Sequence, residues 1–481
     1  MRRTVRLAVL LLSFVLVGCA PPMPKLTGPA KIADLRLSPG LEGNAPTQVA
    51  ANANWWRPLL NLQGQQVVSL ALAESPDLAL AKGRVQQAAA LLQVAGANLR
   101  PQVDASGQIE GNRWTKNQFY LPPYSGASSW NNALRLDFSY SLDLWGKNRE
   151  QAKAAGFQLA TAEQQQRAAA LILENAVLQQ LIANAGDDAL LQQLHRQREI
   201  LLQIEAIARL RQQHGLADSL HTLAIASQLV TAEQEIDRVE AQRQHSQEAL
   251  AVLCGVGTRL PQNLEQVSLP TSSSWHSPQR VPAAWIANRP DVLARRSAIE
   301  AAAAAVHVAR DDYYPNINLV AFAGGLAAAG GLFTFLHPGS LQAGLGPAIS
   351  LPLFSGGRLR GQFDARRAAY RIALAQYRQT LLQALQEVAG ALTELQAADR
   401  ERQQLQEDQQ VLQRKERVQQ QRYRAGLSNQ LPVLAAELSL LDNRLQRIRL
   451  DVHAQQTLIN LYAGLGGRVP AGTWPSAGVH S

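Results

Sequence analysis

The sequence predicts a mainly α-helical fold with a membrane β-barrel portion and two structural repeats per chain. Three observations lead to this prediction: two proline-free stretches of more than sixty residues, four segments in which apolar and polar residues alternate, and a repeat of the whole pattern about 210 residues further on. Rods this long and strands this few cannot bury their apolar surfaces within one chain. The sequence therefore predicts an assembly of several copies.

The first long helix is expected between Ser141 and Gln213. This stretch contains no proline, and Ala, Leu, Gln, Glu and Arg, which are strong helix formers, make up most of it. At about 1.5 Å per residue the helix would be on the order of 100 Å long. No compact domain of ordinary size covers such a rod, so its apolar stripe is expected to pack on other long helices in a coiled-coil bundle.

A second rod is expected from Arg358 to Arg424, which is also free of proline. Its apolar residues step by four, three, four and three, which is the seam of a heptad repeat: Leu381, Leu385, Val388, Leu392 and Leu395.

Alternating segments follow Pro101 and Pro315. The cleanest is Leu134 to Leu144, whose eleven residues match the roughly 9–11 that a transmembrane strand needs, with one apolar and one polar face. We expect β-hairpins at about 102–144 and 316–354. One sheet of a soluble domain is the alternative, but it would need a second apolar layer that this sequence does not offer.

Four landmarks recur in register and define the duplication: Pro76-Asp77 with Pro290-Asp291, Pro101 with Pro315, Leu142 to Trp145 with Leu351 to Phe354, and Gly215-Leu216 with Gly426-Leu427. The predicted organisation is a signal peptide (1–18), a lipidated tether (19–64), repeat 1 (65–255), an irregular equatorial segment (256–284), repeat 2 (285–467) and a C-terminal tail (468–481).

The N-terminus predicts export. Three arginines precede an apolar run from Leu7 to Val17, which is too short to span a bilayer and fits a secretory signal. The ending Leu16-Val17-Gly18-Cys19 resembles a bacterial lipobox, which implies cleavage before Cys19, acylation of this residue, and, with Ala20 next, the outer membrane. The alternative is an ordinary signal peptide with an incidental cysteine. Cys254, the only other cysteine, is expected to be a buried thiol.

Composition argues against several function classes. The formal charge is +9, and without the three arginines of the predicted leader the remaining +6 is spread across helix faces, which favours a solvated surface over nucleic-acid binding. The sequence has no His-Glu-x-x-His and no Walker motif, so we expect no enzyme activity, metal or cofactor.

The number of strands predicts the number of copies. The smallest outer-membrane barrels have about eight strands, and an open edge in lipid costs several kcal/mol per unpaired amide. Two copies would supply eight strands and three would supply twelve. An eight-stranded barrel is filled by its own side chains, so a conducting protein is expected to use three copies.

Several motifs together resemble the TolC-type outer-membrane efflux proteins, in the lipoprotein branch that serves multidrug and aromatic-acid pumps: Ser75 to Leu78, Leu142 to Gly146, Asn288 to Val292, Tyr314-Pro315, Leu351 to Arg358, and Arg422 to Leu427. The resemblance covers the chain from about Trp55 onward. It implies a homotrimer in outer-membrane lipid, with a shared 12-stranded barrel and a helical tunnel in the periplasm. Its partners would be a periplasmic adaptor and an inner-membrane transporter, and its function passive efflux of drugs or small toxic compounds.

The resemblance also implies site residues. The two Gly-Leu turns would form the periplasmic tip, and the adaptor would contact Gly215, Leu216, Arg422, Tyr423, Gly426, Leu427 and Ser428. Pro101 and Pro315 would mark the junctions of helices and barrel. Many relatives close the tip with an aspartate where this chain has Ala435, so Glu437 and Asp218 are the candidate gate residues. The alternative is that Glu437 is a solvated helix acid.

Two alternative functions stay open at this stage. A channel for type I protein secretion would use the same architecture. A periplasmic coiled-coil scaffold lipoprotein would explain the rods and Cys19 but not the duplicated strands.

Overall fold

A computed structural model describes residues 21–23, 26–38, 40–42, 54–119, 121–122, 125–216, 218–261, 278, 280–327 and 331–468. Cys19, the signal peptide, most of the equatorial segment and all but one residue of the tail lie outside these ranges. The chain divides into two compact units. Unit 1 comprises 1–29, 84–163 and 294–377, and unit 2 comprises 30–83, 164–293 and 378–481.

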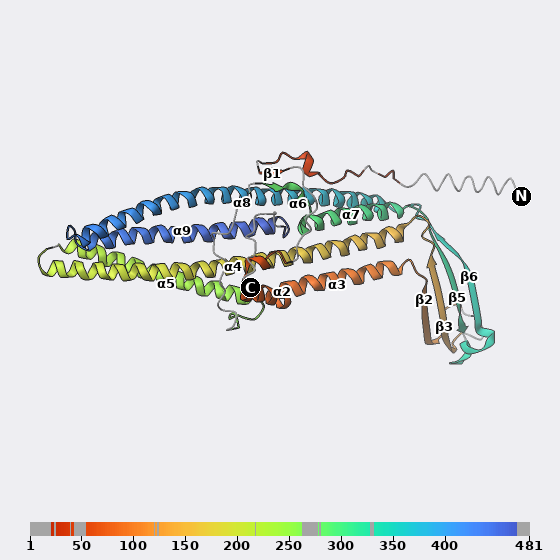
Figure 1. Ribbon diagram of the computed structural model, residues 1–481. Helices are drawn as coiled ribbons and strands as arrows, with labels where there is room; N and C mark the ends of the chain where they lie inside the picture. The colour runs from red at the N-terminus through yellow and green to blue at the C-terminus, as the bar shows by residue number, and fades with distance from the viewer. Residues whose placement is uncertain are drawn as a thin grey trace. The chain divides into compact units, whose positions relative to one another are not determined.

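The elements repeat in the same order in the two halves of the chain (Figure 1). The α-helices are α2 (Leu62–Glu74), α3 (Pro76–Ala97), α4 (Lys147–Gln213), α5 (Ser219–Leu253), α6 (Ala283–Ala287), α7 (Pro290–Asp311), α8 (Arg358–Arg424) and α9 (Leu431–Gly464). The strands are β1 (Leu41–Glu42), β2 (Gln102–Arg113), β3 (Ser128–Ser141), β4 (Val281–Pro282), β5 (Asn316–Ala327) and β6 (Leu341–Ser350). Short 3-10 helices are η1 (Ile32–Asp34), η2 (Arg57–Leu59), η5 (Thr334–Leu336) and η6 (Pro338–Ser340). Both predicted rods are present, because α4 and α8 each have 67 residues.

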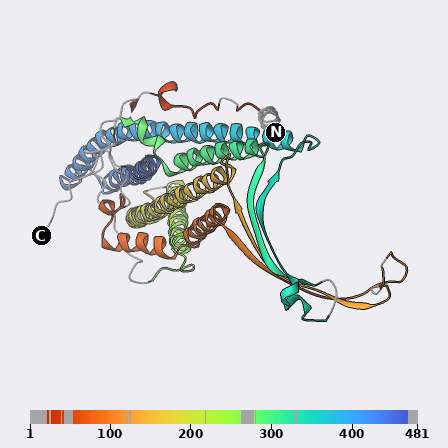
Figure 2. The ribbon, with the colours of Figure 1, turned by 90° about the vertical axis from the view of Figure 1, so that its right-hand side faces the viewer.

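Unit 1 contains one antiparallel sheet with the strand order β2-β3-β5-β6. Figure 2 shows the four strands running side by side as a curved sheet. The register places Leu136 of β3 between Ala105 of β2 and Ala323 of β5, and Ala323 beside Ala343 of β6. Successive side chains along a strand point to opposite faces, so these residues share one apolar face. Strands β2 and β6 are the edges of the sheet.

The predicted strand ends were wrong by a few residues. β3 ends at Ser141 and not at Leu144, because Asp143 has a left-handed backbone (φ 42°) and Gly146 follows with φ 87°. The Asp143 carboxylate accepts hydrogen bonds from the backbone N–H groups of Asn148 and Arg149, at 2.8 and 3.0 Å, and so caps the start of α4. β6 ends at Ser350 and not at 354, since Pro352 has no N–H for the ladder.

Unit 2 is held together by apolar clusters between its helices. Leu194 of α4, Ile236 of α5 and Leu445 of α9 belong to one cluster, and Ala398 of α8 packs with Ala454 of α9 in another. Helix α9 therefore contacts both the α4–α5 pair and α8. This packing covers only part of the apolar stripes of the rods within one chain, because Ile172 of α4 and Val411 of α8 remain 69% and 56% exposed.

Candidate functional site

Two turns end the long helices, one between α4 and α5 and one between α8 and α9, and Figure 1 shows them at the same end of unit 2. Both have the same backbone. Gly215 and Gly426 are left-handed, with φ 69° and 71°. The Leu216 N–H donates to the Arg211 carbonyl and the Leu427 N–H to the Arg422 carbonyl, each at 2.8 Å. This pattern is a Schellman motif, in which the left-handed position is usually glycine and sometimes asparagine.

The structure places most of the predicted tip residues at the surface. Leu216 and Leu427 are 68% and 73% exposed, and Tyr423 is 45% exposed. Gly215, Gly426 and Arg422 are also exposed, whereas Ser428 is half-buried. The two turns therefore each leave a large apolar side chain exposed to water.

A buried cluster near the turns joins helices α4 and α5 to α9. Ile200 and Ile204 of α4 pack with Ile225 of α5, and Leu434 and Leu441 of α9 complete the cluster. The two turns are therefore parts of one packed structure, although more than 200 residues separate them in the chain.

The candidate gate residues have different contacts. A terminal guanidinium nitrogen of Arg196 lies 2.8 Å from the Glu437 carboxylate and ties α4 to α9, and this hydrogen bond raises the pKa of Arg196. Asp218 instead caps α5 by accepting from the His221 N–H at 3.0 Å. Within the described residues no hydrogen bond or ion pair joins Asp218 to Glu437. Arg196 was not predicted from the sequence, because nothing in the sequence pairs residues 241 positions apart.

The face of the sheet opposite the apolar one is defined here as the polar face, and it carries Asp104, Glu110, Arg135 and Asp137. Arg135 forms an ion pair with Asp137 at 2.6 Å, and its guanidinium lies 4.4 Å from the centre of the Phe322 ring. On the apolar face large side chains are exposed, among them Val103, Leu136 and Leu345, with Leu345 76% exposed. One wet and one apolar face is the pattern of a membrane-spanning barrel.

Comparison with known proteins agrees with this architecture. Residues 67–256 and 281–467 match the family described as outer membrane efflux protein.

The chain belongs to the outer membrane efflux protein family.

Two curated relatives extend the match. The fusaric acid resistance protein FusA of Burkholderia cepacia is 33% identical, over 76% of this chain and 70% of that protein. The pyoverdine export outer membrane protein OpmQ of Pseudomonas putida is 31% identical, over 96% of this chain and 97% of that protein.

Solved structures have the same fold. The outer membrane protein VceC of Vibrio cholerae superposes with a TM-score of 0.76 at 29% identity, over 87% of this chain and 99% of VceC. The CmeC outer membrane channel of Campylobacter jejuni gives a TM-score of 0.80 at 20% identity, over 93% of this chain and 94% of CmeC. The predicted fold class is confirmed. The predicted function and location are confirmed as well: the chain is the outer-membrane component of an efflux system, with a long periplasmic helical extension.

The junction of helices and strands in this efflux protein is fixed by an aromatic stack. Trp145 lies on Tyr314, with ring centroids 4.9 Å apart, and its indole N–H donates to the Pro315 carbonyl at 2.8 Å. Lys147 pairs with Asp312 at 2.6 Å. Pro315 thus takes part in the junction directly. Pro101 lies between α3 and β2, where its ring ends the helix.

A clamp that the sequence did not predict holds the segment preceding α2. The indole N–H groups of Trp55 and Trp56 donate to the two carboxylate oxygens of Glu174 in α4, at 2.7 and 3.2 Å, and all three side chains are buried. Burial raises the pKa of Glu174, although the two hydrogen bonds oppose this. Two adjacent tryptophans before a helix were the only sequence signal.

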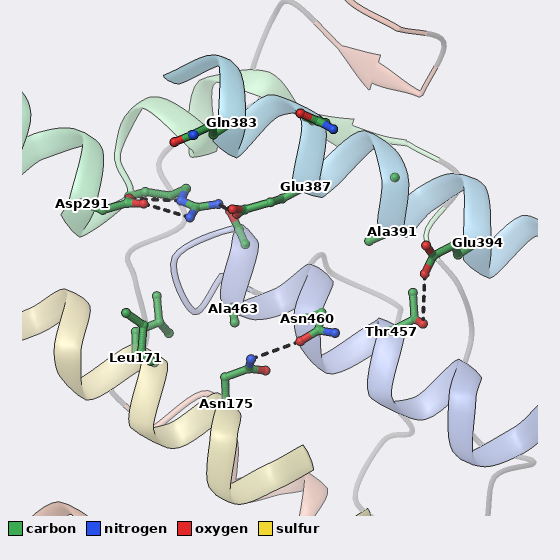
Figure 3. Close-up of a pocket in the computed structure, with 15 residues that line it drawn as sticks. Leu171, Asn175, Asp291, Gln383, Glu387, Ala391, Glu394, Thr457, Asn460 and Ala463 are labelled. Carbon is green, nitrogen blue, oxygen red and sulfur yellow. Dashed lines mark hydrogen bonds and ion pairs between the residues drawn. The ribbon is translucent and has the colours of Figure 1, made fainter. Parts of the chain in front are cut away.

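A polar groove of about 860 Å³ opens beside the buried end of α9 (Figure 3). Arg289 spans it, with nitrogens 2.9 Å from Asp291 and 2.8 Å from Glu387, and it also donates to the Gly464 carbonyl at 3.2 Å. Burial alone lowers the pKa of Arg289, but the two carboxylates outweigh burial and raise it. The arginine therefore joins the start of α7, the middle of α8 and the end of α9, which explains its place in the Asn288 to Val292 motif.

Proposed function

We propose that three copies of this chain join their sheets into one twelve-stranded barrel and their long helices into a periplasmic tube. Drugs or other small toxic compounds would pass through it passively, delivered by a periplasmic adaptor and an inner-membrane transporter. The observation that carries the proposal is the four-stranded sheet with two open edges and one exposed apolar face. In lipid such edges must pair, and only other copies offer matching strands.

Three copies fit better than two. Eight strands enclose a space that side chains fill, whereas larger barrels leave a lumen. The polar face here carries several charged residues, which need water rather than a packed core. These charges support a wide, wet barrel.

The exposed tip supports docking of the adaptor. Leu216 and Leu427 would supply apolar contacts, with Gly215 and Gly426 shaping the turns. Arg422 and Tyr423 precede the second turn, and Ser428 follows it. Aromatic and arginine side chains are frequent anchors at protein interfaces.

The ion pair between Arg196 and Glu437 supports a gate that differs from the aspartate of many relatives. It joins the two helix pairs of one chain close to the tip, beside the cluster around Ile204. An exposed pair of this kind contributes about 0–1 kcal/mol. Such a contact is weak enough for a docking partner to break. Asp218, which caps α5, has the smaller role in this proposal.

The position of Thr27 supports a lipid on Cys19. The Tyr370 hydroxyl donates to the Thr27 carbonyl at 2.7 Å, twelve residues into α8 from its start beside the sheet. Those residues of helix measure about 18 Å, and the eight residues from Cys19 to Thr27 reach at most about 29 Å. The chain is therefore long enough to bring an acylated Cys19 to the membrane surface at the base of the barrel.

The decisive experiment combines assembly, conduction and efflux. The purified protein should migrate as a heat-modifiable trimer and form conducting channels in planar bilayers, and deletion of its gene should sensitise cells to a panel of drugs and aromatic acids. Tyr423→Glu should abolish resistance while trimers persist. Gln406→Glu adds the same charge to an exposed site of α8 that is farther from the turn, and it should leave resistance intact.

Other outcomes would reject the proposal. A soluble monomer without conductance contradicts the barrel. Unchanged resistance in Tyr423→Glu removes the tip assignment. If the deletion strain fails to secrete a protein while its drug resistance is unchanged, the channel belongs to type I secretion instead.

A further inference from the structure

We propose that the charged side chains on the polar face of β2 and β3 make the barrel cation-selective, with Asp104 and Glu110 as the determining residues. The inference rests on the proposed barrel, in which this face lines the lumen. It assigns a discrimination by charge to the transmembrane part of the channel, in addition to conduction.

The charges of the sheet are distributed unevenly. Strands β5 and β6 contain no charged residue, and the only charge of β2 and β3 on the apolar face is Arg113 at the end of β2. The polar face carries three acidic residues and one basic residue in each chain. Three chains would therefore surround the lumen with an excess of negative charge.

The one arginine on this face is neutralised and held against the wall. Its guanidinium donates to the Asp137 carboxylate at 2.6 Å and covers the Phe322 ring at 4.4 Å. Phe322 is paired in register with Gly344, where a Cβ atom would lie 2.6 Å from the ring. The ring thus occupies the space that Gly344 leaves open, and the Arg135 guanidinium lies over the ring.

Among the described residues no such cation pairs with Asp104 or Glu110. Asp104 is paired in register with Asp137, so two carboxylates lie on neighbouring strands near the helical end of the sheet. Glu110, near the other end of β2, accepts a hydrogen bond from Gln108 at 2.9 Å. In the four strands the only basic side chain on the polar face is already bound to Asp137. Both carboxylates are exposed.

Fixed carboxylates on a pore wall select cations, as acidic rings do in cation channels. The distance over which these charges act depends on the salt concentration, because the Debye length is about 3 Å at 1 M and about 30 Å at 0.01 M. In a wide lumen the selectivity should therefore be strong in dilute salt and weak in concentrated salt.

The test is the reversal potential of single channels in a potassium chloride gradient. The wild type should favour potassium over chloride. Asp104→Asn combined with Glu110→Gln should lower the permeability ratio roughly two- to threefold, because each lost charge weakens the local potential. Arg135→Gln should raise the ratio, since it leaves Asp137 without its cation.

Arg113→Gln is the matched control, because it removes a charge from the same strand but on the opposite face, and it should leave the ratio unchanged. Conducting channels whose ratio is the same in all variants would overturn the inference while the barrel stands, as would a wild type that prefers chloride. A wild type that forms no channel would overturn the barrel, and the inference with it.

Discussion

At the scale of single residues, this protein buries carboxylates that are satisfied to different degrees. Glu174 has both oxygens bound by the indoles of Trp55 and Trp56. Asp187 of α4 is also buried, and one of its oxygens lacks a hydrogen-bond partner among the described residues. The first carboxylate holds two tryptophans in place. The second lowers the free energy of unfolding by an amount that varies with pH.

The clamp predicts a loss of stability in Glu174→Gln. The amide keeps one acceptor oxygen but presents an NH₂ group to the other indole N–H. A buried donor without an acceptor costs about 1–3 kcal/mol. Thermal unfolding of the trimer, followed by circular dichroism, should show a lower midpoint. Glu248→Gln, on the exposed side of α5, should unfold like the wild type, and an equal loss there would contradict the clamp.

Asp187 predicts a pH-dependent stability. Burial, followed by the neighbouring charge of Asp188, raises its pKa to about 6, and Arg238 and Arg243 oppose this only partly. Between about pH 4 and 6 the folded protein then binds more protons than the unfolded chain, so the free energy of unfolding falls as pH rises. The ionised Asp187 side chain would lower the free energy of unfolding by up to about 2 kcal/mol per chain at neutral pH.

Asp187→Asn should therefore stabilise the protein at pH 7.5, and the stabilisation should shrink as the pH falls toward 4. Unfolding midpoints measured at several pH values would show the difference, with the exposed Asp237→Asn as control. A variant that is destabilised equally at all pH values would exclude this explanation.

At the scale of elements, the two turns depend on their left-handed glycines. Gly426→Pro would impose a negative φ where 71° is needed and would remove the N–H that donates to the Tyr423 carbonyl. We expect it to distort the tip and abolish efflux, while the barrel still holds the trimer. Gly426→Asn, which tolerates the left-handed region, should retain most of the efflux. Drug susceptibility and trimer content measure both effects, and loss of efflux in the asparagine variant alone would contradict this reasoning.

The sequence predicted these elements well because their signals are local. Proline-free heptads predicted α4 and α8, and strict alternation predicted the strands. The ends of β3 and β6 were misjudged because the alternation of leucines continues past Ser141, whereas the backbone at Asp143 had already turned. The contacts of Glu174, Arg196 and Arg289 join residues far apart in sequence, and no periodicity in a single sequence reveals such pairs.

At the scale of the whole molecule, the open edges of the sheet predict where copies meet. Cysteines introduced on β2 at Ser106 and on β6 at position 346 or 348 should form disulfide-linked trimers in a background without Cys254. Ser139→Cys with Val320→Cys joins neighbouring strands of one chain and should give only internal links. Gel electrophoresis without reductant distinguishes these cases. Links within a single chain between β2 and β6, with no larger species, would contradict closure by several copies.

The predicted family and fold class could be recognised from the sequence because the duplication doubles every signal. The charge pattern of the sheet was less accessible, since the register is needed to see that Asp104 of β2 and Phe322 of β5 share a face with Arg135 and Asp137. The predicted domain limits, the tip contacts and the lipid on Cys19 stay predictions.

The equal lengths of α4 and α8 constrain how such a protein evolves. Both helices have 67 residues and both end in the same turn. Deleting one heptad from α4 alone would draw Gly215 back by about 10 Å, while Gly426 kept its position. The two turns would no longer finish level with each other, and a partner could not rest on both. Lineages can therefore adjust the reach of this protein toward the inner membrane only by matched insertions or deletions in the two halves of the gene.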